Sequence, residues 1–124
     1  MTKQELEIRL VMFAARCVNV CGALPPRKIG SSSFADQLFR SATSIAANYA
    51  EAAEAESRKD FVHKIKIAAK ELSETRVWLK LIGASGYLPA EKLLKLIAES
   101  EELSRILGAS IITARRKRQD SAEE

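Results

Sequence analysis

Apolar residues recur at three- and four-residue steps through four long segments of this chain, the spacing that places them on one face of an α-helix. In the first segment this stripe consists of Leu6, Leu10, Phe13, Cys17 and Val20. Similar stripes and the breaks between them predict four helices, roughly at residues 3–22, 33–56, 58–84 and 89–115. The tail, residues 116–124, passes from basic to acidic, and we expect it to fray.

Gly and Pro residues mark some of the connections between the predicted helices but not others. Gly22 ends the first helix, and ALPPRKIGSSS forms a loop of about a dozen residues that contains three breakers. Ser33 followed by Asp36 resembles a capping box and opens the second helix. Neither Gly nor Pro marks the turn near Ser57, but one helix over 34–84 would be about 75 Å long at 1.5 Å per residue. A helix of that length is too long for so small a globular domain. We therefore predict that the chain reverses direction in a tight turn near Ser57.

Four amphipathic helices with mostly short connections predict an all-α fold. The expected architecture is an up-down-up-down antiparallel four-helix bundle that forms a single domain over residues 1–124. Hydrophobic residues make up 47% of the chain, which is enough for a well-packed core.

The third predicted helix has three faces at 100° per residue. Its core stripe is Phe61, Ile65, Ala68, Leu72 and Leu79. On the opposite face lies a basic set, called the lysine stripe below: Lys59, His63, Lys66 and Lys70. Apolar residues also lie outside the core stripes of this helix and of the last one: Ile67, Val77, Trp78, Leu81, Leu94 and Ile112. Because a monomeric bundle does not bury these side chains, they predict a second buried surface and therefore self-association.

Charge is concentrated on the same helix. The chain has a formal net charge of +4. Residues 57–86 contain seven Lys or Arg and three Asp or Glu, whereas the segments before and after are balanced. This excess favours an anionic partner.

The cysteines and the hydropathy pattern predict a cytoplasmic protein. Cys17 and Cys21 lie four residues apart in an apolar stripe, which indicates two small buried side chains instead of a disulfide or a zinc site. The N-terminus does not have the pattern of a signal peptide, and no apolar run approaches the roughly 20 residues of a membrane span.

No set of residues predicts catalysis, so we expect that the protein is not an enzyme and uses no cofactor or metal. His63 is the only histidine and lies among lysines. Glu71 and Glu74 share one side of a helix, but no Glu-x-x-His pair accompanies them, so a di-iron site is unsupported. Trp78 fits an interface anchor better than a cofactor platform. Asn48 fits a structural hydrogen bond to a neighbouring helix or loop better than a ligand role.

The segment from residue 40 to residue 82 resembles the four-helix-bundle family of 23S rRNA intervening-sequence proteins. It contains a Ser-Ile-x-x-Asn-x-x-Glu pattern at Ser44–Glu51 and a Ser-Arg-Lys-Asp-Phe opening at Ser57–Phe61. The later Glu-Thr-x-x-Trp-Leu pattern falls at Glu74–Leu79. Where many members have Pro or Gly, this chain has Ala46, Ala47 and Ala52, so a flexible glycine cannot be carried over.

The resemblance implies a four-helix bundle that assembles as a homopentamer. A related branch comprises accessory variability proteins of diversity-generating retroelements, which bind a reverse transcriptase and nucleic acid. The resemblance implies no catalytic residues.

Two functions are compatible with these observations. The first is a non-enzymatic oligomeric scaffold that binds RNA or DNA through the lysine stripe, with Arg58, Lys64, Lys80 and the run at 115–118 nearby. Repetition around an oligomer would add weak phosphate contacts, although the stripe is also compatible with a solvated helix face. The second is a protein-interaction adaptor, for example an accessory subunit of a reverse transcriptase or a partner of a ribosome-associated protein.

Overall fold

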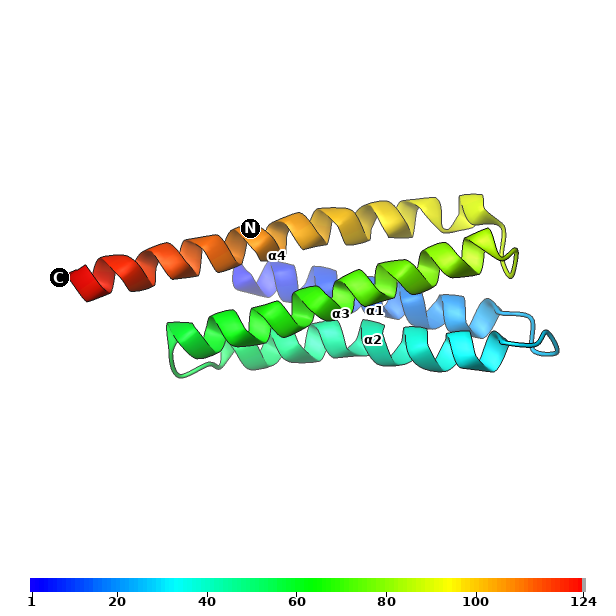
Figure 1. Cartoon of the computed structure of the whole chain (residues 1–124), viewed down its shortest axis with the longest axis horizontal. Coiled ribbons are helices and arrows are strands. Elements are labelled where there is room, and N and C mark those ends of the chain that lie inside the picture. Colours follow the sequence, from blue (N-terminus) through cyan, green and yellow to red (C-terminus); the bar gives the residue numbers. More distant parts are fainter. Residues whose placement is uncertain (124) are drawn as a thin grey trace.

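The computed structural model describes residues 1–123 and confirms an all-α bundle. Four long helices, α1 (Lys3–Ala23), α2 (Ser31–Ala53), α3 (Arg58–Ala84) and α4 (Leu94–Glu123), are accompanied by the short 3-10 helix η1 (Ala90–Lys92). Each long helix runs antiparallel to the one before it (Figure 1). No strand occurs within the described residues.

Local capping explains where α1 and α3 begin. The Thr2 hydroxyl accepts a hydrogen bond from the backbone N–H of Glu5 at 3.0 Å, and the Glu5 carboxylate accepts one from the backbone N–H of Thr2 at 2.8 Å. Before α3, the Ser57 hydroxyl accepts a hydrogen bond from the backbone N–H of Asp60 at 3.0 Å. Each cap satisfies N–H groups that have no partner inside the helix.

The start of α2 differs from the prediction. The helix begins at Ser31, and its N-cap is Gly30 with φ of 88° and no side-chain cap. A Cβ added at Gly30 would lie 2.8 Å from the hydroxyl oxygen of Tyr87. Glycine is therefore required both by the left-handed backbone and by the close approach of a side chain from beyond α3.

The ends of α2 and α4 also differ from their predicted positions. α2 stops at Ala53, three residues before the predicted boundary. η1 replaces the predicted first turn of the last helix, and α4 begins at Leu94. The segment from residue 116 to residue 123, for which fraying was expected, continues α4. Glu124 lies outside the described residues.

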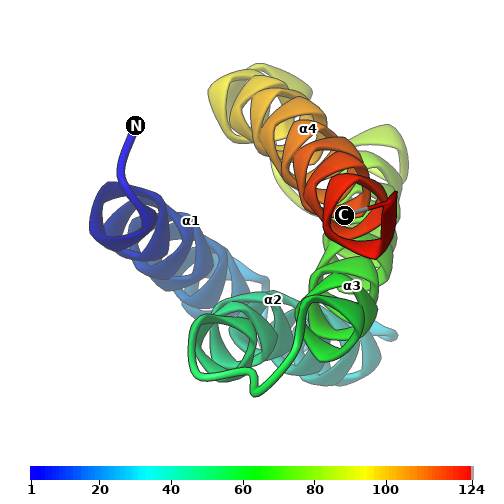
Figure 2. The ribbon, with the colours of Figure 1, turned by 90° about the vertical axis from the view of Figure 1, so that its left-hand side faces the viewer.

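The core is formed by the inward faces of all four helices. Its largest fully buried side chains are mostly leucine, isoleucine and phenylalanine: Phe13, Leu10, Leu38, Ile45, Ile65, Leu72, Leu79, Ile82, Leu93, Leu103 and Leu107. Helices that follow one another in the chain pack closely, whereas α1 and α4 make few contacts with each other. Viewed along the bundle, the side between α1 and α4 is the most open (Figure 2).

Candidate nucleic-acid interface

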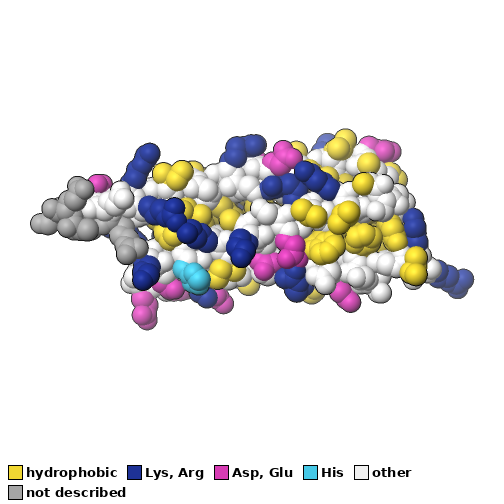
Figure 3. Space-filling model, in the orientation of Figure 1, with side chains coloured by type: hydrophobic (Ala, Val, Ile, Leu, Met, Phe, Trp, Pro, Cys, Tyr) yellow, Lys and Arg dark blue, Asp and Glu magenta, His cyan; other side chains and the backbone are white. Residues whose placement is uncertain are grey.

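The lysine stripe lies on the outward side of α3. Lys59, His63, Lys66 and Lys70 are all exposed and follow one another at steps of four, three and four residues. The stripe is about 16 Å long at 1.5 Å per residue. Figure 3 shows the histidine in cyan near several dark-blue basic side chains on this face of the molecule. Within the part of the chain that the structure describes, none of the four forms an ion pair.

Two of the other basic residues near the stripe, Lys64 and Arg58, are held by hydrogen bonds, whereas Lys80 is exposed. Lys64 lies toward α2, and its ammonium group donates a hydrogen bond to the Glu51 carboxylate at 2.8 Å. That hydrogen bond raises the pKa of Lys64. Arg58 donates to the backbone carbonyl of Lys117 at 2.9 Å and so connects the start of α3 to α4. Lys80 is exposed one turn beyond Arg76.

The basic run at residues 115–118 falls in the last third of α4. Arg115, Arg116 and Lys117 are exposed there. The side chain of Arg118 lies outside the described residues.

The outward face of α3 changes from basic to apolar along its length. After Lys70 the same face continues through Val77, which is 53% exposed, and Leu81, which is 41% exposed. On α4, Leu94 and Ile112 are also exposed. These four side chains, predicted from the sequence to lie at an oligomer interface, are accessible in the protomer.

The other two predicted interface residues, Ile67 and Trp78, are half-buried in the protomer. The Trp78 ring packs edge-on against Phe34 of α2, with 6.2 Å between ring centroids. Its indole N–H donates to the Glu74 carboxylate at 2.9 Å. Trp78 therefore has a structural role at the α2–α3 seam.

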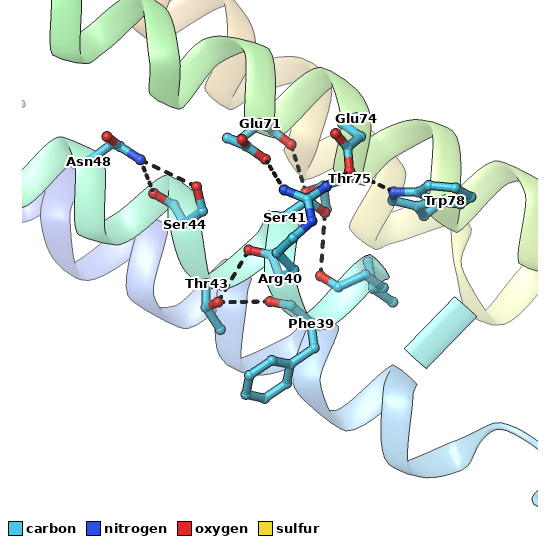
Figure 4. Close-up of polar contacts among 11 residues, drawn as sticks. Phe39, Arg40, Ser41, Thr43, Ser44, Asn48, Glu71, Glu74, Thr75 and Trp78 are labelled. Atoms are coloured by element: carbon cyan, nitrogen blue, oxygen red, sulfur yellow. Dashed lines mark hydrogen bonds and ion pairs between the residues drawn. The ribbon is translucent and has the colours of Figure 1, made fainter. Parts of the chain in front are cut away.

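Glu71 and Glu74 are held by an arginine (Figure 4). Arg40 of α2 donates to Glu71 at 3.2 Å and also to Glu74, which in turn accepts from Trp78. No group of three or more His, Cys, Asp or Glu side chains that could hold a metal ion occurs among the described residues. The observed role of the two carboxylates is to connect α2 to α3.

The hydrogen-bond partners of Asn48 differ from those predicted. Its side-chain amide donates to the backbone carbonyl of Ser44 at 2.9 Å and to the Ser44 hydroxyl at 3.3 Å (Figure 4). Both partners lie one turn earlier in α2, whereas a neighbouring helix or loop was expected.

A further apolar surface on α1 was missed in the sequence. Ile8, Val11 and Met12 are exposed on the side of α1 opposite its core stripe, and Ile8 and Met12 are 63% and 58% exposed. With Ala15 they repeat at the spacing i, i+3, i+4 and i+7, a signal that could have been read directly. Phe39 of the neighbouring helix α2 is 50% exposed. A helix with apolar residues on two opposite faces is typical of one that packs on both sides.

None of the helices in residues 1–123 combines the length and apolar character needed to cross a membrane.

Comparisons with known proteins agree with the resemblance seen in the sequence. Residues 9–109 match the family model described as 23S rRNA-intervening sequence protein. The structure is similar to a crystal structure from Bacteroides thetaiotaomicron, described as a protein of unknown function from the S23 ribosomal protein family. The two share 34% sequence identity with a TM-score of 0.77, and the alignment covers 86% of this chain and 97% of the other. A search of the curated proteins finds no match.

Proposed function

Because the chain belongs to the family of 23S rRNA-intervening sequence proteins, we propose that it is a non-enzymatic homo-oligomeric scaffold that binds RNA or DNA through the lysine stripe. The observation that carries the proposal is the contrast between Lys64 and the stripe. Lys64 is paired with Glu51, whereas Lys59, Lys66 and Lys70 have no acidic partner among the described residues. Three unneutralised ammonium groups on one exposed face attract a polyanion.

The mode of binding follows from what surrounds these lysines. The N-terminal half of α3 contains no Tyr or Trp, and its one Phe, Phe61, is half-buried and packs against the core. Because no Phe, Tyr or Trp is exposed beside the lysines, base stacking is poorly supported there, so we expect contacts to phosphates and little sequence preference.

The dependence of binding on salt tests this proposal. For duplex DNA, a plot of the logarithm of the association constant against the logarithm of the salt concentration has a negative slope. Each phosphate contact makes that slope steeper by about 0.9. The double variant Lys66→Gln/Lys70→Gln should therefore bind labelled duplex DNA and single-stranded RNA more weakly, with a shallower slope, in fluorescence anisotropy titrations. Lys92→Gln/Lys95→Gln is the matched control, since it also removes two charges and both lysines are exposed but lie outside the stripe. Absence of binding by the intact oligomer at low salt, or an equal loss in the control, would contradict the proposal.

The proposed assembly is the homopentamer that the family resemblance implies. Exposed apolar side chains on α1 (Ile8, Met12) and on α3 (Val77, Leu81) support it. Two different faces suit a ring in which one face of a protomer contacts the other face of the next. We expect both Ile8→Ser/Met12→Ser and Val77→Ser/Leu81→Ser to lower the mass measured by light scattering. A monomeric wild-type protein would refute the assembly.

The apolar surface on α1 also supports the alternative function, a protein-interaction adaptor such as an accessory subunit of a reverse transcriptase or a partner of a ribosome-associated protein. Co-purification from the native host tests it. An adaptor should recover one stoichiometric partner that Ile8→Ser/Met12→Ser loses, and recovery of the oligomer alone would count against it.

A further inference from the structure

A groove of about 730 Å³ lies at the end of the bundle where α1 begins. It is bounded by the end of α2, the α2–α3 turn, the start of α3 and the C-terminal half of α4, and Lys3 stands at the start of α1. None of the four residues of the lysine stripe lines it, whereas Arg58 and Lys117, two of the basic residues named above as near the stripe, do.

The groove occupies the place where a fourth helix would continue. α4 extends well past the start of α1, and there it lies beside the start of α3 and the α2–α3 turn (Figure 1). The wall from α4 runs from Ile106 to Lys117, which is about 16 Å, or three turns of helix. Three turns of a further helix would therefore fit beside α4, in line with α1.

The surface of the groove suits an apolar helix face. Its floor and walls contain Phe61, Ile106 and small residues: Ala52, Ala53, Ala55, Ala109, Ser110, Thr113 and Ala114. Small side chains allow another helix backbone to approach closely, and the larger ones provide apolar contacts. The Lys3 ammonium group lies over the Phe61 ring, 5.3 Å from the ring centroid, so a positive charge stands at the edge of this apolar surface.

The charged residues around the groove indicate which charges a helix bound there would carry. Lys3, Arg58 and Lys117 line it, and among the described lining residues the one carboxylate is that of Glu56. We propose that this groove is a docking site for an acidic amphipathic helix of a partner protein, with its apolar face on α4 and Phe61 and its carboxylates toward Lys3 and Lys117.

A designed peptide tests the proposal on the full-length protein in its native assembly. The probe is a fluorescein-labelled helix of about four turns, with leucines at i, i+4, i+7 and i+11 and glutamates on both flanks. One control peptide has lysines in place of the glutamates, and another has serines in place of the leucines. We expect anisotropy to show binding of the first peptide only.

Two variants place the binding in the groove. Ala109→Phe fills the groove, and Lys117→Glu reverses one charge at its edge; each should weaken binding about tenfold. Their matched controls on the same helix are Ala98→Phe and Lys95→Glu, which are exposed outside the groove and should bind as the wild type does. Circular dichroism melts confirm that each variant is folded.

Three outcomes would overturn the proposal: no binding of the acidic peptide, equal binding of the lysine peptide, or equal losses in the control variants. If Ala109→Phe instead abolishes binding of a labelled oligonucleotide while the peptide does not bind, the groove is a nucleic-acid site. Lys66→Gln/Lys70→Gln should leave peptide binding unchanged, so failure of the groove proposal and failure of the lysine-stripe proposal can be told apart.

Discussion

Arg9 of α1 and Glu99 of α4 form a two-pronged ion pair across the most open side of the bundle. The guanidinium donates through Nε at 2.8 Å and through Nη2 at 2.7 Å, one bond to each carboxylate oxygen. α1 and α4 make few other contacts, so this pair is a specific connection between the first and last helices. The hydrogen bonds from Arg9 lower the pKa of Glu99, against the opposing effect of burial.

The Arg9–Glu99 pair predicts an acid-sensitive part of the stability. Because the hydrogen bonds from Arg9 lower the pKa of Glu99 from its ordinary value, the pair stabilises the fold at pH values above that ordinary pKa. The contribution is lost as the pH falls through the folded-state pKa. We expect Glu99→Gln to lower the free energy of unfolding by about 1 kcal/mol at pH 7, and the difference from wild type to shrink below about pH 4. Urea unfolding at pH 7 and at pH 4 measures this difference in the free energy of unfolding.

Glu101→Gln, which changes an exposed neighbour on α4, is the control. A difference between Glu99→Gln and wild type that does not depend on pH would contradict the assignment.

Ser41 and Thr75 form a buried polar contact between α2 and α3. Their hydroxyl oxygens lie 2.8 Å apart, and both side chains are fully buried. Thr75→Val keeps the shape but leaves the Ser41 hydroxyl with only a 3.4 Å contact to the Leu38 carbonyl, so it should cost about 1–3 kcal/mol. Ser41→Ala/Thr75→Val should cost less than the sum of the single changes, because neither polar group is then left alone. A double-mutant cycle of unfolding free energies measures this coupling. Additive costs would show that the two hydroxyls do not interact.

Several parts of the fold could be predicted because their causes are local in the sequence. α3 lies at its predicted position, since Ser57 caps it and Gly86, with φ of 75°, follows its end. The outward position of the lysine stripe also follows from helical periodicity alone.

Other features depend on contacts between distant residues. The backbone at Gly30 is shaped by Tyr87, whose hydroxyl donates to the carbonyl of Ile29. Trp78 and Leu81 looked alike in the sequence pattern, and only the position of Phe34 shows that one of them packs inside the protomer. The groove beside α4 lies past the start of α1, so it depends on the relative positions of two helices that are distant in the sequence.

The different positions of Trp78 and Leu81 allow folding and assembly to be separated. Trp78→Ala removes the edge-on contact with Phe34 and the hydrogen bond to Glu74, and should lower protomer stability by about 2 kcal/mol. Val77→Ser/Leu81→Ser changes only exposed side chains, and should reduce the oligomer mass while leaving helix content unchanged. Circular dichroism melts and light scattering on the same samples give both quantities. A stable Trp78→Ala protomer with a reduced mass would show that Trp78 acts at the interface instead.

The two cysteines should differ in reactivity. Cys17 is fully buried, and burial raises the pKa of its thiol to about 12. Cys21 is half-buried, its pKa is raised mainly by burial, and its thiol donates to the Ala35 carbonyl at 3.5 Å. At pH 8 only about one Cys17 thiol in ten thousand would be ionised, and the reagent must reach it through the core. We therefore expect iodoacetamide to modify native Cys21 slowly and Cys17 only when the protein unfolds. Mass spectrometry of the Cys21→Ser variant, native and in urea, measures the Cys17 rate alone; similar rates in the two conditions would mean that α1 opens readily from the bundle.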